Sequence, residues 1–448
     1  MIYELRSAGF AAAICLLVNP AALWAQDDTL AIVGGRLIDG YGGTPVHDSV
    51  VLVSGNRISA VGAQEDTNIP DGTRVIDADG LTVMPGLIDL HVHFDIIGHS
   101  DYDHWFATYE SRMRSDILPT AARIMLDAGV TSVRDLGTDI DNSFWLREEI
   151  NSGRMPGPRP FIAGPFLRKT PTSFVSKDFV DTWVVESPAD GRRKVRRLVE
   201  MGVDVIKTQD ENLSKAELVA IYDEAHKLGM RVATHLFSQK ALRTALEAGL
   251  GQWDTIEHIG DGAQPSYPDD IVNMIVEQQV AMGPTIMADE GLRQIYLNPE
   301  LVHDPTWKKH MPVDIYQDIR GSYEHPSRHP LFTGAVFNRE AKMMKLRQLF
   351  EAGAPFIVSS DSGSRANPHH IAAAREMYFL HQDVGLSPMQ AIMAGTRWAA
   401  VVLNQQDNLG TIAEGRLADI IVVDGDPLQN LGDLRHVLHV IKDGDVIR

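Results

Sequence analysis

The stretch MPGLIDLHVHFD, residues 84–95, ends an apolar run with two histidines, His91 and His93. Short apolar runs of this kind are typical of buried β-strands. Side chains two residues apart in an extended segment point to the same side, so we expect both imidazoles to face one way. Two imidazoles on one side can bind a single divalent metal ion. The stretch therefore predicts a strand whose carboxyl end carries metal ligands.

Seven more short apolar runs follow along the chain, and helix-like segments separate them. We expect helices over residues 118–128, 190–201, 215–228, 239–248 and 339–352, each followed by a glycine of the kind that often ends a helix. Eight strand–helix units favour an α/β fold of the (β/α)8 type, the TIM barrel. The alternative is an open, doubly wound parallel sheet. The eight runs read LTVMPGLIDLHVH, VTSVRD, RPFIAG, VDVIK, MRVATH, WDTIEH, QVAMGPTIM and APFIVSSD.

The two ends of the chain have a different pattern. Both contain short apolar runs bounded by turns rich in glycine and aspartate, which indicates strands. Neither end alone could cover its apolar face, so we expect the two to pack into one small β-sandwich. The predicted organisation is a β-sandwich subdomain from residues 26–83 and 405–448, and a barrel domain over residues 84–404.

The first 25 residues are expected to be a signal peptide. Arg6 precedes an apolar run over residues 8–18 that is too short to span a bilayer, and the small residue Ala25 ends the segment. The alternative is a buried amino-terminal helix. The only cysteine, Cys15, lies in this segment. The mature chain, expected to be periplasmic or secreted, would therefore have no disulfide, cysteine nucleophile or cysteine ligand.

The composition limits the kinds of partner. The chain has 448 residues, of which 44% are hydrophobic and 23% charged, in the range of globular proteins, and its formal net charge is −19. Such a surface repels nucleic acid and anionic membranes. The expected partner is a small-molecule substrate, with no membrane contact after cleavage of the signal peptide. Formation of a homo-oligomer stays open.

Four further polar residues stand at the ends of apolar runs: Lys207, His235, His258 and Asp361. The carboxyl ends of barrel strands meet on one face, where barrel enzymes have their active sites. Taken singly, each has an ordinary structural explanation, such as a lysine that reaches solvent or an aspartate that caps a helix. Together with the two histidines above, these four residues make six such groups on one face, and this combination favours a metal site instead.

These motifs resemble those of the amidohydrolase superfamily, and the resemblance covers nearly all of the mature chain. It implies a TIM barrel with a metal centre. The lysine at the fourth strand points to the binuclear branch with a carboxylated lysine, and the pattern is most similar to carboxypeptidase-like, prolidase-like and ochratoxin-hydrolysing members. The matching motifs are MPGLIDLHVHFD, GVTSVRDLG, VIK, ATH, IEH, SSDSG and GTIAEGRLADIIVVDGDP.

The resemblance also implies a role for each of the six residues. Two divalent ions, expected to be Zn²⁺, would be bridged by Lys207 as a carbamate formed with CO₂. A hydroxide that bridges the ions would attack the scissile carbonyl, and Asp361 would move its proton to the leaving amine. The ligands of the first ion would be His91, His93 and Asp361, and those of the second His235 and His258.

Substrate contacts are expected from two long loops, over residues 165–187 and 288–337, and from residues near the metal ligands. Phe237 stands where many similar enzymes have a tyrosine that binds the α-carboxylate of the substrate, so that hydroxyl is missing here. Cations could replace it, although solvated loop cations are the alternative reading. The candidate substrate-binding residues are Arg134, Arg168, Phe237 and Tyr323, with Lys169 beside Arg168.

The expected reaction is the hydrolysis of an amide bond to a C-terminal amino acid, as in a dipeptide. Alternatives on the same fold are a hydrolase of a lactone, cyclic amide or phosphotriester, and a mononuclear deaminase, against which Lys207 argues. A binding protein without catalytic activity is a third class. Such proteins typically lose ligands, whereas all six are present here.

Overall fold

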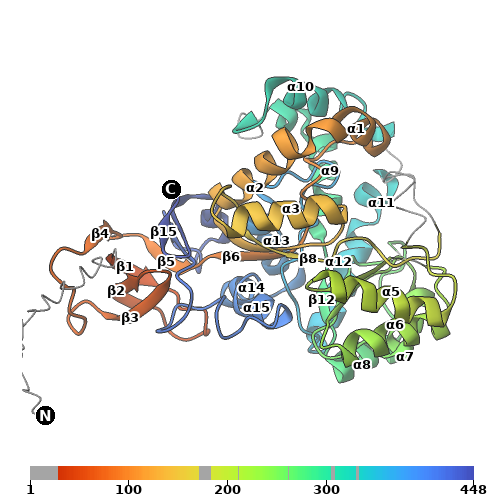
Figure 1. The fold of residues 1–448 in the computed structure, drawn as a ribbon, viewed down its shortest axis with the longest axis horizontal. Helices are drawn as coiled ribbons and strands as arrows, with labels where there is room; N and C mark the ends of the chain where they lie inside the picture. Colours follow the sequence, from red (N-terminus) through yellow and green to blue (C-terminus); the bar gives the residue numbers. More distant parts are fainter. Residues whose placement is uncertain (1–28, 171–182, 210, 261, 304–307, 329–331) are drawn as a thin grey trace, which may run out of the picture.

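The computed structural model describes residues 29–170, 183–209, 211–260, 262–303, 308–328 and 332–448. The expected signal peptide, residues 1–25, lies outside the described residues. Helices and strands alternate through the middle of the chain and strands gather at both ends, so the fold is of the α/β class (Figure 1). Within the described part of the chain, no helix combines the length and apolar character needed to cross a bilayer.

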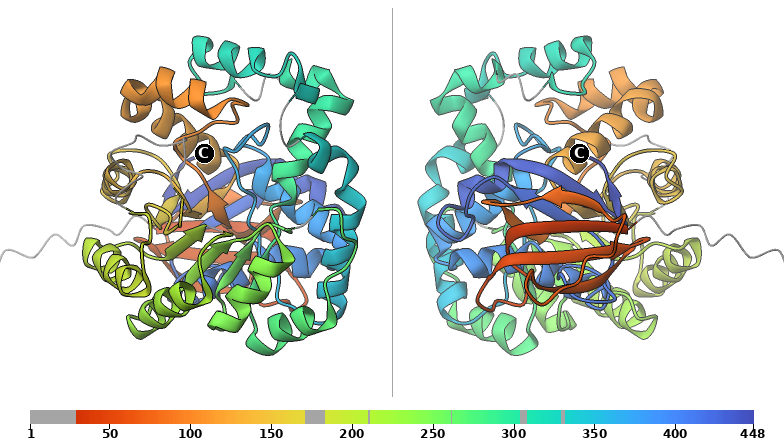
Figure 2. Two further views of the ribbon diagram at one scale, coloured as in Figure 1. Left: turned by 90° about the vertical axis from the view of Figure 1, so that its right-hand side faces the viewer. Right: turned by 90° about the vertical axis from the view of Figure 1, so that its left-hand side faces the viewer.

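Strands from the two ends of the chain join in one sheet of eight strands (Figure 2, right). They are β1 (Thr29–Leu37), β2 (Val46–Ser54), β3 (Arg57–Ala63), β4 (Arg74–Asp77), β5 (Thr82–Pro85), β13 (Ile420–Val423), β14 (Val437–Lys442) and β15 (Asp445–Val446). The main path runs β15-β14-β13-β5-β1-β2-β3, and β4 pairs with β1. Strand β5 pairs antiparallel with β13, with Ile420 opposite Pro85. Backbone hydrogen bonds as well as a shared apolar cluster therefore hold the two ends together.

Seven strands in the middle of the chain form two parallel sheets. They are β6 (Leu87–Val92), β7 (Val130–Asp135), β8 (Arg159–Ile162), β9 (Ile206–Gln209), β10 (Val232–His235), β11 (Thr255–Glu257) and β12 (Ala281–Gly283). One sheet has the order β6-β7-β8 and the other the order β12-β11-β10-β9. Helices lie around the outside of these strands (Figure 2, left). Single parallel bridges connect the two sheets with each other and with a later segment, and the bridged pairs are Leu167 with Thr208, Met282 with Phe356, and Val92 with Ser362.

The eighth predicted strand, residues 354–361, is not a continuous strand and contains a single bridge, at Phe356, with a second at Ser362 just after it. Val358 accepts a hydrogen bond from Leu90 of β6 but donates its own N–H to Ala394, away from the two sheets. At Asp361 the backbone φ is 58°, a left-handed conformation that cannot continue an extended segment. These departures interrupt the ladder, so the prediction of a regular strand here was wrong.

The five helices predicted from the sequence are present, with bounds that differ by at most two residues. Glycines in the left-handed conformation end two of them, at Gly202 (φ 93°) and Gly249 (φ 103°). Glycine adopts this conformation at little steric cost, and it turns the chain toward the next strand. The five helices are α2 (Leu118–Asp127), α5 (Pro188–Met201), α6 (Lys215–Lys227), α7 (Gln239–Ala248) and α12 (Arg339–Glu351).

The long segment after β12, predicted as a loop over residues 288–337, is largely helical, so that prediction was wrong. Ile315 and Ile319 lie four residues apart on one helix face and are fully buried, which is the spacing that favours an amphipathic helix. The segment contains α9 (Ile286–Leu297), η4 (Pro299–His303), α10 (Val313–Gly321), η6 (Pro326–Arg328) and α11 (Phe332–Phe337). Among the described residues the remaining helical segments are α1 (Tyr102–Tyr109), η1 (Glu110–Arg112), η2 (Met113–Ile117), α3 (Ile140–Asn151), α8 (Asp269–Gln278), α13 (Ala372–Phe379), η7 (Leu380–Val384), α14 (Pro388–Ala394), α15 (Arg397–Val402) and η8 (Leu431–Arg435).

Arg159, at the start of β8, links the parallel strands to the end sheet. Its guanidinium donates to Asp419 at 2.6 Å and also contacts Asp443. The side chain of Asp419 is only 5% exposed, so removal of the arginine would leave a buried carboxylate without its cation. We expect Arg159→Ala to lower the free energy of unfolding by about 3 kcal/mol, measured by urea denaturation.

Arg154→Ala is the matched control, because the side chain of Arg154 is 52% exposed and pairs with carboxylates at the surface. The Arg154→Ala substitution should lower the free energy of unfolding by less than about 1 kcal/mol. Equal stability of the two variants would show that the contact between the sheets contributes little.

Candidate metal centre

The six residues predicted to bind metal all line one cavity of about 850 Å³. The four histidines lie at or just after the carboxyl ends of β6, β10 and β11, Lys207 is the second residue of β9 and not its last, and Asp361 lies in the segment that bridges to β6. Parallel strands bring these ends to one side, which is where α/β proteins place their sites. The prediction that the six lie together is therefore met, and they are His91, His93, Lys207, His235, His258 and Asp361.

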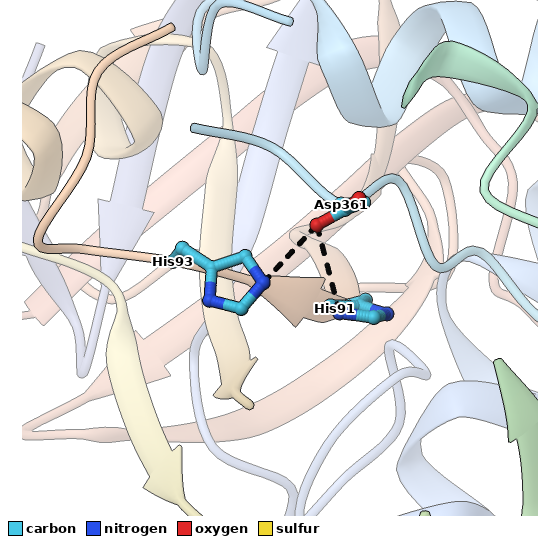
Figure 3. A group of neighbouring side chains, drawn as sticks. All are labelled: His91, His93 and Asp361. Atoms are coloured by element: carbon cyan, nitrogen blue, oxygen red, sulfur yellow. Dashed lines mark ion pairs between the residues drawn. The ribbon is translucent and has the colours of Figure 1, made fainter. Parts of the chain in front are cut away.

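His91, His93 and Asp361 form the first group of donors (Figure 3). One carboxylate oxygen of Asp361, Oδ1, lies 3.1 Å from Nε2 of His93 and 3.6 Å from Nε2 of His91. Ligand atoms on a tetrahedral zinc ion, with bonds of about 2.0–2.1 Å, lie about 3.3 Å from one another. The two imidazoles and the carboxylate are therefore spaced as ligands of one ion would be.

His235 and His258 form a second group beside the first. Nδ1 of His235 lies 2.8 Å from Nε2 of His258, and the ring centroid of His258 lies 5.2 Å from that of His91. Nδ1 of His258 is 2.7 Å from the hydroxyl of Thr285, so Nε2 is the atom that faces the other imidazole. A cation could take the place of the proton that the two nitrogens share.

Two of these residues adopt a backbone conformation that is rare outside glycine. The φ angle is 71° at His258 and 58° at Asp361. Such conformations cost about 1–3 kcal/mol and concentrate at functional sites. The turn at Asp361 is held in part by Asn367, whose side-chain amide donates to the Asp361 carbonyl at 2.8 Å. These backbone conformations therefore lower the stability of the fold and fix the direction in which the two side chains point.

Lys207 contributes a buried amine without a partner. The residue is 1% exposed, and Nζ has no hydrogen-bond partner among the described residues. Burial lowers the pKa of Lys207 to about 8. Burial penalises the ammonium, and the carboxylates of Glu257 and Asp361 offset only part of this penalty, so the neutral amine is more accessible near neutral pH than in an exposed lysine.

The electrostatics of the site favour an ionised carboxylate at Asp361 and neutral imidazoles at His91, His235 and His258, whereas the Asp361 carboxylate outweighs burial and raises the pKa of His93. Burial lowers the pKa of His91 to about 4 and that of His258 to about 3. Burial alone would raise the pKa of Asp361, but the neighbouring imidazoles of His91 and His93 outweigh it and hold that pKa below its usual range. These are the protonation states in which both side-chain types bind a metal.

Glu257 supports the centre, although the sequence analysis assigned it no role. Its buried carboxylate lies 2.9 Å from Nδ1 of His91 and accepts from Arg134 at 2.6 Å and from the hydroxyl of Ser359 at 2.7 Å. A carboxylate on one imidazole nitrogen fixes the ring and leaves the other nitrogen for a metal. Its one signal in the sequence is its place directly before His258 in the IEH motif.

Gly137 lets the ring of His93 pack closely against the chain. A Cβ at this position would lie 2.8 Å from atoms of that ring and 2.7 Å from the ring of Phe166. Any larger residue would therefore displace a predicted ligand. This explains the glycine that ends the GVTSVRDLG motif.

Three of the predicted substrate-binding residues line the cavity, namely Arg168, Phe237 and Tyr323. Phe237 is 55% exposed and packs edge-on against His235, with ring centroids 4.2 Å apart. The guanidinium of Arg168 lies over the ring of Phe166. Tyr323 is buried and donates its hydroxyl proton to a backbone carbonyl, so it shapes the wall of the cavity.

Arg134 has a different position from the one expected. It is 1% exposed and is absent from the described residues that line the cavity. Its guanidinium donates to Glu257 and to the carbonyl of Leu90 at 2.7 Å. Because its side chain leaves β7 toward the interior, Arg134 holds Glu257 in place, and the expected contact with substrate is corrected accordingly.

The positively charged side chains near the cavity also differ from the expectation. Lys169 contacts Glu217 and donates to the carbonyl of Val185 at 3.1 Å. Arg328 and Arg365, which were not predicted, line the cavity together with Arg168. Arg365 stands two residues after the SSDSG motif, which is the one sequence signal that could have identified it.

Comparisons with known proteins give a consistent match. The sequence model of the amidohydrolase family matches residues 82–447. An uncharacterized protein of Mycobacterium tuberculosis is 28% identical over 372 residues, which cover 82% of this chain and 85% of the other. An imidazolonepropionase of Haloarcula marismortui is 22% identical over 403 residues, covering 88% and 87%. A solved structure of a Xaa-Pro dipeptidase with methionine bound in its active site is 25% identical, with a TM-score of 0.74 and coverage of 94% of this chain and 100% of that one.

Glu257→Gln tests the role of the buried carboxylate. Glutamine cannot offer an anionic oxygen to both His91 and Arg134, so the ring of His91 would lose its anchor. We expect the affinity of the metal-free protein for Zn²⁺ to fall about 10–100-fold, measured by titration against a competing chelator. Glu277→Gln, an exposed control on α8, should bind zinc as the wild type does. Wild-type affinity in a cooperatively folded Glu257→Gln variant would contradict this role.

Proposed function

This chain belongs to the amidohydrolase family, and we propose that it is a metal-dependent hydrolase that cleaves an amide bond to a C-terminal amino acid. One observation carries the proposal: four imidazoles, the carboxylate of Asp361 and the unpaired amine of Lys207 converge on one cavity. Neutral nitrogen donors and a carboxylate suit Zn²⁺ and related divalent ions.

The donor set fits two divalent cations. The unpaired Nζ of Lys207 fits a carbamate, because a neutral amine can form a bond to the carbon of CO₂ with release of a proton. An ammonium would repel the cations, whereas the carbamate gives each of them an anionic oxygen. The first cation would be held by His91, His93 and Asp361, the second by His235 and His258, and both by carboxylated Lys207.

The residues of the chain divide the remaining work. When bound, the cations would polarise the scissile carbonyl and make water a competent nucleophile near neutral pH. Asp361 is held ionised, so its carboxylate can accept a proton from water and return it to the leaving amine. Phe237 offers an apolar face to the substrate beside His235.

The choice of substrate class rests on charge. With a net charge of −19 the protein as a whole repels anions, yet Arg168, Arg328 and Arg365 line the cavity. Arginine can bind both oxygens of a carboxylate at once. The similarity to a Xaa-Pro dipeptidase whose structure holds methionine in its active site supports the same class of substrate.

A second candidate function is the hydrolysis of a cyclic amide. The similarity to an imidazolonepropionase favours it, and the same donors would serve the chemistry. Lactones and phosphotriesters are further substrates for such a centre. A mononuclear deaminase accounts less well for Lys207, which adds a donor beyond those that one ion needs.

We also propose how the chain is organised. The bridges between the two parallel sheets support their closure into a (β/α)8 TIM barrel, with residues 354–361 in the place of the eighth strand. The barrel domain would span residues 84–404, and the end sheet would form the β-sandwich subdomain of residues 26–83 and 405–448. A signal peptide over residues 1–25 would direct the protein to the periplasm or out of the cell.

Asp361→Asn tests the proton transfer. The amide cannot accept a proton, so turnover of a dipeptide should fall about 10²–10⁴-fold, while the melting temperature changes little. Metal content is measured on the same sample. Asp407→Asn is the control, because the side chain of Asp407 is 85% exposed. A variant that keeps a third of wild-type turnover would exclude Asp361 as the acid and base.

The substrate class is tested with an N-acyl amino acid and its C-terminal amide. The amide offers the guanidinium no anionic oxygen for a charge-assisted hydrogen bond, so kcat/KM should be about 10–100-fold lower for the amide. In Arg168→Ala the two substrates should become more alike. In Lys169→Ala, whose lysine contacts Glu217, the preference should persist. Equal cleavage of acid and amide by the wild type would contradict the proposed substrate while leaving the metal centre intact.

A further inference from the structure

A second cluster of metal-binding side chains lies outside the cavity. It consists of His99, which follows β6, His104 on α1 and Asp318 on α10, and their donor atoms lie within 4.8 Å of one another. Helices α1 and α10 are neighbours in space although more than 200 residues separate them (Figure 1). None of the three residues is among the described residues that line the cavity.

The distances in this cluster match those of the candidate metal centre. Oδ2 of Asp318 lies 2.9 Å from Nε2 of His104 and 3.6 Å from Nε2 of His99. The corresponding distances around Asp361 are 3.1 and 3.6 Å. Both sets bracket the spacing of about 3.3 Å between ligand atoms on tetrahedral zinc.

The orientation of His99 favours a cation between its ring and the carboxylate. Nδ1 of His99 lies 2.8 Å from the carbonyl of Asp101, and the tautomer that donates to it leaves Nε2 bare toward Asp318. The backbone N–H of Asp101 also approaches Nδ1, at 3.0 Å. In the tautomer that accepts it, Nε2–H would face Asp318 across 3.6 Å, too far for a hydrogen bond.

The surroundings hold these donors in place. The rings of His99 and His104 stack, with centroids 5.2 Å apart and an angle of 22° between their planes. Tyr109 donates its hydroxyl proton to Asp318 at 3.0 Å. Burial lowers the pKa of His99, which favours the neutral form that binds metals. Carbonyl and hydroxyl partners of this kind are what orient metal ligands.

We infer that His99, His104 and Asp318 bind a divalent cation of the zinc class at a site separate from the hydrolytic centre. His104 is 46% exposed through its side chain, so water can complete the tetrahedral coordination. The net charge of −19 raises the local concentration of cations.

The cation would join two parts of the cavity wall. Residues just after His99 and just after α10 line the cavity on the same side, among them Ser100 and Ser322. These two serines are already linked by two hydrogen bonds, of 3.2 and 2.8 Å. A cation held by one residue from α1 and one from α10 therefore fixes the spacing of both helices, and with it this wall of the cavity.

Zinc binding to the full-length protein tests the inference without reference to catalysis. Metal-free wild type, His104→Gln, Asp318→Asn and the control His303→Gln, an exposed histidine in η4, are dialysed against buffered Zn²⁺, and bound zinc is counted per chain. We expect one ion fewer in His104→Gln and in Asp318→Asn, and no change in the control. Removal of the hydrogen-bond partner of a metal ligand typically lowers metal affinity by about 10–100-fold. Removal of the ligand itself should cost more, so we expect the zinc affinity of this site to fall more than about 100-fold.

A variant of the hydrolytic centre separates the two sites. His235→Gln should still bind the cation of the His99 cluster and still show a zinc-dependent rise in melting temperature, whereas His235→Gln combined with His104→Gln should lose that rise. If the proposed centre bound no metal, the difference of one ion between wild type and His104→Gln would remain. Equal zinc counts in wild type, His104→Gln and Asp318→Asn would overturn the inference.

Discussion

The buried amine of Lys207, without a hydrogen-bond partner among the described residues, is the constraint around which the site is arranged. Burial lowers its pKa, and burial also lowers the pKa of His91 and of His258, so that their imidazoles are neutral. The one strongly ionised ligand at the cavity is Asp361. The nitrogen and oxygen lone pairs of these side chains lie so close together that hydrogen bonds among the side chains cannot satisfy all of them. The proposed divalent cations, with a carboxylated lysine as a shared anionic ligand, would satisfy all of these groups.

The scaffold holds this arrangement at a cost in stability. His258 and Asp361 adopt left-handed backbone conformations, and the buried pair of Arg134 and Glu257 is retained beneath His91 where an apolar pair would often be at least as stable. Both features become intelligible if the fold is selected to hold donor atoms at fixed positions. The backbone ladder between β5 and β13 and the link from Arg159 to Asp419 supply rigidity elsewhere in the molecule.

Much of the site could be predicted because its residues stand at the ends of short apolar runs, where parallel strands place them together. The helix bounds followed from apolar spacing and from terminal glycines such as Gly202 and Gly249. Three features escaped prediction for physical reasons. The run at residues 354–361 has the composition of a strand, but its hydrogen bonds go partly to Ala394. In residues 288–337, polar residues lie between the apolar ones and obscure the spacing that would have indicated helices with a buried face. Arg134 was expected to meet substrate because a single arginine in a strand does not reveal the buried carboxylate that it pairs with.

The most direct measurement is ¹³C NMR of the protein after metal removal and reconstitution with Zn²⁺ and ¹³C-labelled bicarbonate. A carbamate on Lys207 predicts one enriched resonance per chain that requires both zinc and CO₂ and is absent from Lys207→Arg. It also predicts that activity returns together with that resonance. A fully active, zinc-loaded protein without a carbamate carbon, or the same resonance in Lys207→Arg, would contradict the central role given to this lysine.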